Sequence, residues 1–150
     1  MADWQQFEQR IQELERKRKP SQNRRAVFEV IKSSNLQPHP DFDASLYLGP
    51  LVDLAGQPIC LEYTNDRPNL WFHARHAEKL EKAGLKLERK PPIGAESEDR
   101  HAGLKGKGFK DIDAFRLGGL DPAVTRSALA ALGMLKAEGG DLKVTSVKVV

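Results

Sequence analysis

The spacing of apolar residues changes from a helical period to a strand period about one third of the way along the 150-residue chain. Before this change, four large apolar side chains recur at spacings of three and four, so they share one helix face: Trp4, Phe7, Ile11 and Leu14. This spacing predicts a helix over residues 3–18, with Asp3 as its N-cap and Pro20 just beyond its end. A second, shorter helix is expected over residues 22–33, with Ser21 as its cap.

From residue 46 onward, short apolar runs alternate with turn residues, which indicates strands. The candidate strands cover residues 46–52, 59–63, 70–75, 85–89, 112–117 and 144–150. Tight connections between the first three favour an antiparallel meander. Two further helices are expected over residues 77–83 and 121–136, and Asp121 is expected to cap the second. The inward side chains of that helix are Val124, Ala128, Ala131, Leu132 and Leu135.

These patterns predict an α+β fold. We expect two N-terminal helices, a mostly antiparallel sheet of four to six strands, and a C-terminal helix packed on the sheet. A length of 150 residues suits one domain, so residues 1–150 are expected to form a single unit, with a helical segment over residues 1–36.

The composition narrows the class of protein. Apolar residues make up 39% and charged residues 30%, which is typical of a globular chain, and no apolar run is long enough to cross a membrane. The N-terminus does not resemble a signal peptide, and a lone cysteine, Cys60, cannot form an internal disulfide. We therefore expect a cytoplasmic protein without a membrane partner, and nothing in the sequence calls for a cofactor.

Charge is unevenly distributed along the chain. Residues 1–40 carry eight basic and five acidic groups, residues 41–70 carry one and five, and residues 71–110 carry ten and six. Two basic stretches thus flank an acidic one. Such patches favour anionic partners by long-range attraction, although charged residues also serve simply to solvate exposed faces.

The run Leu70–Arg75 carries the strongest hint of function. On a strand, side chains alternate between faces, so Trp71, His73 and Arg75 would form a row on one face. An aromatic ring, an imidazole and a guanidinium in a row can stack bases and neutralise phosphates. In the alternative, that face is covered, Trp71 is buried and Arg75 pairs with Glu62.

Two other segments concentrate cations. Residues 90–110 show no periodic spacing of apolar residues and are expected to form a basic, glycine-rich loop. The cations of this loop, Arg100, Lys105, Lys107 and Lys110, could contact a nucleic-acid backbone. The loop does not match a P-loop, and a flexible, solvated excursion is the alternative. The run Arg16–Lys19, with Arg24 and Arg25, could also lie along phosphates, or could be a solvated hinge.

Catalytic signals are weaker. His73 with Glu62 is the best candidate pair for acid–base chemistry, and His76 and His101 are further candidates. Asp41, Asp43 and Glu62 could be imagined as ligands of a nuclease metal, but no Cys or His pair has zinc spacing, and Cys60 is expected to be a core residue.

Three functional interpretations follow. The leading one is a non-enzymatic binding module for DNA or RNA that uses Trp71, His73, Arg75 and the loop cations. The second is a protein-interaction or accessory subunit, or a homodimer, that docks through Trp4, Phe7, Ile11 and Leu14. The third is a small hydrolase or nuclease that uses His73 and Glu62.

Overall fold

The computed structural model describes residues 2–92 and 102–136, except for the side chains of residues 102, 103 and 105. The helices in these ranges are α1 (Trp4–Lys17), α2 (Gln22–Lys32), α3 (Ala74–Lys82), α4 (Pro122–Ala131) and a short 3-10 segment, η1 (Ala102–Lys107). The strands are β1 (Gln37–Pro38), β2 (Leu48–Val52), β3 (Pro58–Glu62), β4 (Asn69–Phe72), β5 (Glu88–Lys90) and β6 (Ala114–Leu117).

The strands form one sheet in the order β1-β2-β3-β4-β6-β5, and every neighbouring pair is antiparallel. At the centre, Trp71 of β4 lies opposite Cys60 of β3 on one side and Arg116 of β6 on the other. The predicted α+β class, with its antiparallel sheet and C-terminal helix, is therefore confirmed. The two-residue strand β1 was not predicted, because it is short, contains Pro38 and has no alternating apolar pattern.

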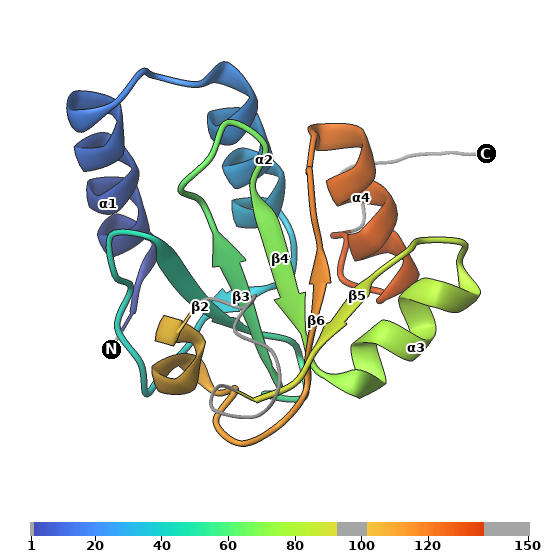
Figure 1. The fold of residues 1–150 in the computed structure, drawn as a ribbon. Coiled ribbons are helices and arrows are strands. Elements are labelled where there is room, and N and C mark those ends of the chain that lie inside the picture. The colour runs from blue at the N-terminus through green and yellow to red at the C-terminus, as the bar shows by residue number, and fades with distance from the viewer. Residues whose placement is uncertain (1, 93–101, 137–150) are drawn as a thin grey trace.

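Three of the helices, α1, α2 and α4, cover one face of the sheet (Figure 1). Each begins at a capping side chain predicted from the sequence: Asp3 accepts a hydrogen bond from the amide of Gln6 at 2.7 Å, Ser21 from Arg24 at 3.1 Å, and Asp121 from Val124 at 2.8 Å. The caps satisfy amides that a helix cannot pair internally and fix where each helix starts.

The predicted apolar stripe of α1 is buried against the sheet and α2. Phe7, Ile11 and Leu14 are all at most 1% exposed. The ring of Phe7 lies 5.2 Å from that of Trp4 and 6.2 Å from those of Phe28 and Tyr63. It also lies directly over Gly49 of β2, where there is no room for a side chain. This aromatic cluster fixes α1 to the fold.

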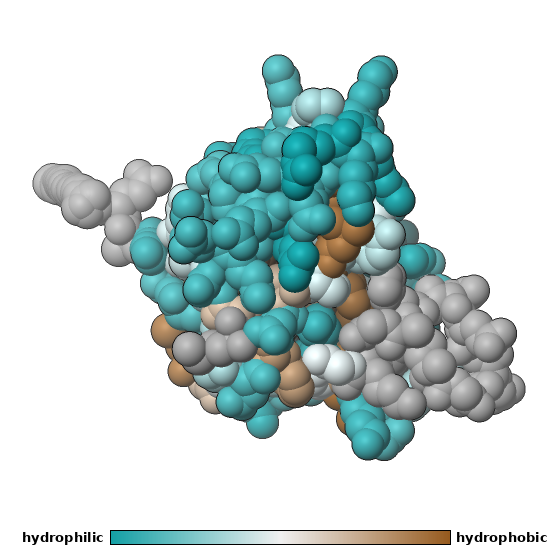
Figure 2. Space-filling view, turned by 90° about the vertical axis from the view of Figure 1, so that its left-hand side faces the viewer, coloured by the Kyte–Doolittle hydropathy of each residue, from teal (hydrophilic) through white to brown (hydrophobic). Residues whose placement is uncertain are grey.

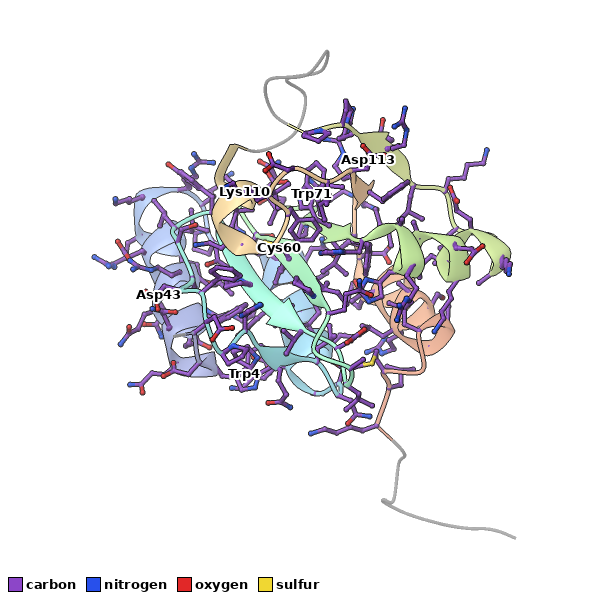
Figure 3. The ribbon with its side chains drawn as sticks, turned by 90° about the horizontal axis from the view of Figure 1, so that it is seen from below. Trp4, Asp43, Cys60, Trp71, Lys110 and Asp113 are labelled. Atoms are coloured by element: carbon purple, nitrogen blue, oxygen red, sulfur yellow. The ribbon has the colours of Figure 1, made fainter. Side chains whose placement is uncertain are left out.

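The opposite face of the sheet has a smaller core beneath η1, as Figure 3 shows for Trp71 and Cys60. Leu104 and Phe109 are fully buried there against Leu48, Cys60 and Trp71. The alternative of a flexible, solvated excursion over residues 90–110 is therefore wrong for the described residues 102–110. Two apolar side chains among the glycines and charges are enough to anchor the segment, although they make no periodic pattern. Residues 93–101 lie outside the described ranges.

Several predicted boundaries are wrong, including the end of the C-terminal helix, which was expected at residue 136 and lies at Ala131. The strand expected over residues 70–75 ends at Phe72, and α3 begins at Ala74 instead of Ala77. His76, Ala77 and Leu80 form a buried helical stripe, so burial extends the helix toward its N-terminus. In the C-terminal helix, Leu135 was expected to face inward but lies beyond the end of α4 and is 41% exposed. The strand expected over residues 144–150 lies outside the described ranges.

Candidate functional site

The expected row of Trp71, His73 and Arg75 on an open sheet face does not form. Trp71 is 1% exposed, because η1 and Phe109 cover it. Its indole Nε1 donates to Oε1 of Glu62 at 2.9 Å, and the guanidinium of Arg116 lies 5.7 Å from its ring centroid. Arg75 is exposed on α3, outside the sheet. The alternative interpretation, in which this sheet face is covered and Trp71 is buried, is therefore correct. Its other part is wrong, because Glu62 forms a hydrogen bond with Trp71 rather than a pair with Arg75.

The candidate acid–base pair, His73 and Glu62, is not brought together. Glu62 lies opposite Asn69, accepts a hydrogen bond from its side-chain amide at 3.1 Å, and is thus already bonded to two neighbours. His73 follows Asn69 by four residues, which places it about 13 Å farther along the strand direction. The His73 ring instead contacts the carbonyl of Gly108 at 3.1 Å and lies 4.8 Å from the Phe109 ring. This position ties β4 to the segment that covers Trp71.

A buried His–Asp pair lies near His73 and was missed by the sequence reasoning. Nε2 of His76, on α3, is 2.8 Å from Oδ2 of Asp53, which lies in the turn between β2 and β3. The other carboxylate oxygen of Asp53 accepts from the amides of Ala55 and Gln57, both at 2.9 Å. Only 5% of the His76 side chain is exposed, so a substrate has no access to the ring. The pair has a structural role instead, because its hydrogen bond holds the turn against α3.

Burial and hydrogen bonding together set the pKa values of the histidines and of Asp53. Burial lowers the pKa of His76 and outweighs the hydrogen bond to Asp53, which acts in the opposite direction. Burial also lowers the pKa values of His73 and, in the N-terminal half, of His39. For Asp53, burial disfavours the carboxylate, but hydrogen bonds from His76, Gln57 and Ala55 together outweigh it, and the pKa of Asp53 is below its ordinary value. The folded state therefore favours neutral histidines and a charged Asp53.

Acidification through the pH range near 6.5 is expected to destabilise the protein. An unfolded histidine binds a proton at about pH 6.5. Because the folded pKa values of His39, His73 and His76 are lower, the unfolded state takes up more protons as the pH falls through this range, and stability falls with it. Urea unfolding at pH 7.5, 6.5 and 5.5 should show a decreasing midpoint. His76→Gln should flatten this decrease, and an increase in stability on acidification would contradict the expectation.

The cations predicted near residues 100–110 do not form a site that can be described. Arg100 and His101 lie outside the described residues, as does the side chain of Lys105. Lys107 is half-buried, and Lys110 is exposed beside η1 (Figure 3). Their predicted contact with nucleic acid remains a prediction.

The other predicted cation run lies at one edge of the molecule. Arg16 and Lys17 end α1, and Arg18 and Lys19 follow it; we call these four residues the basic corner. All four side chains are exposed. The connection between α1 and α2 is the uppermost part of the fold in Figure 1, and Figure 2 shows hydrophilic side chains projecting from this end. The α2 arginines, Arg24 and Arg25, are by contrast held by contacts within the fold.

The two arginines of α2 have different surroundings from the basic corner. Arg25 is paired with Glu8 and with Glu15, and so fastens α2 to α1. Arg24 is buried. Within residues 2–92 and 102–136, no ion pair involves any residue of the basic corner. Arg16 and Lys17 complement the negative end of the α1 dipole, but Arg18 and Lys19 lie past the helix and have no such role.

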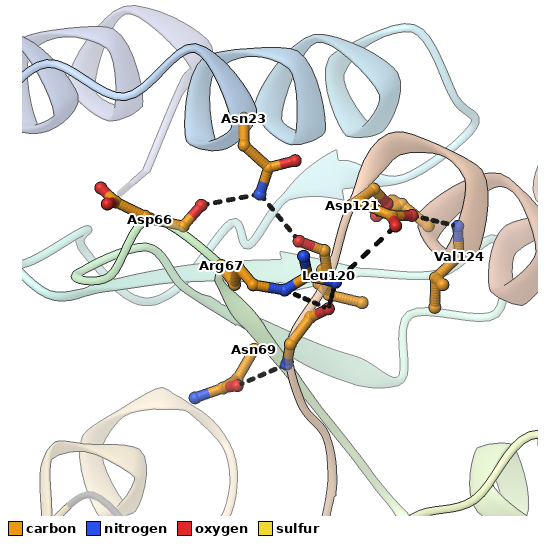
Figure 4. A network of polar contacts seen from close by, with 9 residues as sticks. Asn23, Asp66, Arg67, Asn69, Leu120, Asp121 and Val124 are labelled. Atoms are coloured by element: carbon orange, nitrogen blue, oxygen red, sulfur yellow. Dashed lines mark hydrogen bonds and ion pairs between the residues drawn. The ribbon is translucent and has the colours of Figure 1, made fainter.

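A hydrogen-bond network makes the same edge rigid (Figure 4). The side-chain amide of Asn23, in α2, donates to the carbonyls of Asp66 at 2.7 Å and Leu120 at 2.9 Å. Arg67 donates to the carbonyl of Gly119 at 2.9 Å. The turn between β3 and β4 is thus joined to the first turns of α2 and α4. Two helix N-termini, each with a partial positive charge, lie at the edge that carries the basic corner (Figure 1).

Other kinds of site are not found in the described part of the chain. No three His, Cys, Asp or Glu side chains within it are arranged to hold a metal ion. None of its helices combines the length and the apolar character that crossing a membrane requires. The chain matches no protein-family model, no curated protein and no solved structure in the comparisons made.

Proposed function

We propose that this protein is a nucleic-acid-binding module that holds the phosphate backbone at the basic corner. The observation that carries the proposal is a run of four consecutive exposed cations, Arg16 to Lys19, without an acidic partner among the described residues. Cations that are not neutralised within the fold are available to replace the counterions of a polyanion.

The setting of the run supports the same partner. Basic side chains on one rigid edge, beside two helix N-termini, give a local positive field although the net charge of the chain is only +3. Contacts of this kind fix a backbone in place without reading its sequence. The proposal therefore specifies binding with little sequence preference, and it no longer includes base stacking on the buried Trp71.

The other two interpretations have less support. Docking through the α1 stripe would require Phe7, Ile11 and Leu14 to leave the core in which they are buried. A hydrolase built on His73 and Glu62 lacks contact between its two groups, because each is bonded elsewhere.

The test is a fluorescence-anisotropy titration with labelled single- and double-stranded oligonucleotides at 50 and 200 mM salt. A triple variant, Lys17→Gln, Arg18→Gln and Lys19→Gln, should bind roughly 10- to 100-fold more weakly at the lower salt. Its plot of log affinity against log salt should also be flatter, by about one unit for each lost phosphate contact.

The matched control removes the same charge from the other end of the molecule. Lys79, Lys82 and Lys86 are exposed on and after α3, and their triple replacement by Gln also lowers the net charge by three. We expect this variant to retain most of the affinity of the unmodified protein. Equal losses in the two variants would mean that net charge alone is responsible, and an absence of binding by the folded protein at 50 mM salt would refute the proposal.

A further inference from the structure

A small cleft lies between the connection that joins α1 to α2 and the turn that joins β3 to β4. Its volume is about 240 Å³. The lining residues are Arg18, Lys19, Arg24, Thr64, Asn65 and Asp66. At about 30 Å³ for each water molecule, the space would hold roughly eight waters, which is ample for one tetrahedral oxyanion. Three of the six lining residues are cations and one is an acid.

Arg24 is the unusual member of this group. Its side chain is 3% exposed, and Nη2 donates to the carbonyl of Thr64 at 3.0 Å. Nε and Nη1 are buried and have no hydrogen-bond partner in the described part of the chain. A guanidinium has five N–H donors and always carries its charge, so burial with two nitrogens unsatisfied is costly. An anion in the adjacent cleft would offset that cost.

Among the described residues that line the cleft, Asp66 is the one carboxylate, and it compensates the charge of Arg24 poorly. Oδ1 of Asp66 is 3.9 Å from Nη2 of Arg24, beyond hydrogen-bonding distance, and the Asp66 side chain is 77% exposed. Burial lowers the pKa of Arg24, whereas the charge of Asp66 opposes this shift. The charge of Glu15, in α1, also favours the charged guanidinium, whereas Arg18 and Arg25 add repulsive positive charges. The residues that line the cleft therefore carry more positive than negative charge.

The backbone around Arg24 also favours an anion. Arg24 lies in the first turn of α2, an 11-residue helix whose positive dipole end faces the β3–β4 turn. Helix N-termini and planar guanidinium groups both bind phosphate oxygens well. Here they occur together, with Arg18 and Lys19 at the rim.

We propose that this cleft is a phosphate-binding site, in which Arg24, Arg18 and Lys19 hold one phosphate group. The assignment rests on the proposed function where that phosphate belongs to a nucleic acid. Inorganic phosphate presents the same chemistry without the polymer and is therefore the first probe.

The test is an NMR titration of the ¹⁵N-labelled protein with inorganic phosphate at pH 7.5, compared with chloride at equal ionic strength. Phosphate should give saturable shifts of the Arg24 Nε–H signal and of the backbone amides of Thr64, Asn65 and Asp66. Arg18→Gln and Lys19→Gln, both at exposed positions, should each weaken phosphate binding about tenfold. Lys79→Gln removes an equally exposed cation that lies on α3 and does not line the cleft, and it should change phosphate affinity less than about threefold.

The outcomes separate the two proposals. Saturable phosphate shifts at these residues, without oligonucleotide binding, would support the phosphate site and refute the nucleic-acid function. Oligonucleotide binding without an Arg24 response to phosphate would refute the site alone. Shifts that chloride reproduces, or that Lys79→Gln reduces as much as Arg18→Gln does, would also overturn the site, because they would show screening of a diffuse positive surface.

Discussion

Phe7→Ala is expected to lower the free energy of unfolding by about 3–5 kcal/mol, which is a large part of the stability of a domain of this size. The ring is fully buried and contacts Trp4, Phe28 and Tyr63, so its loss leaves a cavity between α1 and the sheet. Urea denaturation followed by far-UV circular dichroism would measure the change.

The control for this variant is Gln9→Ala, an exposed position on the same helix. Its effect should stay within about 0.5 kcal/mol, because surface substitutions rarely exceed that value. If Phe7→Ala lowered stability no more than Gln9→Ala does, then α1 would not be fastened to the sheet as described.

Gly49→Ala is expected to destabilise the protein by about 3 kcal/mol, the upper part of the range for overpacked cores. A Cβ atom at this position would lie 2.2 Å from Cε2 of Phe7 and 2.8 Å from two further ring atoms, so either the ring or β2 must move. Gly106→Ala serves as the control, because a methyl group there meets nothing within 4 Å. The same urea series would measure both variants.

The clash also predicts that the two positions are coupled. In a Phe7→Leu background, Gly49→Ala should cost less than it does in the unmodified protein, because the smaller side chain leaves room for the new methyl group. Equal costs in both backgrounds would mean that the strain arises in the β2 backbone rather than from the aromatic ring.

Local features were predictable from the sequence, because they depend on residues a few positions apart. Asp3, Ser21 and Asp121 each cap the helix that follows them, as their positions indicated. The α1 stripe was equally clear, since spacings of three and four on a helix leave no choice of face. These features were sufficient to give the fold class.

The candidate site was harder to predict, because it depends on contacts between distant segments. Strand alternation correctly separates the two faces of β4, but it does not say what covers each face. Trp71 is buried by Leu104 and Phe109, more than 30 residues away in the sequence. The pairing of Asp53 with His76 crosses 23 positions and has no local signal apart from the turn that Asp53 organises.

The adjacent cations of α2 illustrate the same limit. Arg24 and Arg25 look identical in a charge count, but successive residues on a helix point about 100° apart. One side chain is consequently buried beside the cleft, while the other is held by Glu8 and Glu15. A charge count alone therefore overstates how many cations of a helical segment are available to a ligand.

The two outermost strands of the sheet bear on self-association. An exposed strand edge is a template on which another chain can add by backbone pairing, and the hazard grows with its length. Here β1 has two residues, one of them Pro38, which lacks an N–H group, and β5 has three residues, all of them charged. Both edges of the described sheet thus offer few free backbone groups to an incoming strand and discourage the growth of cross-β aggregates.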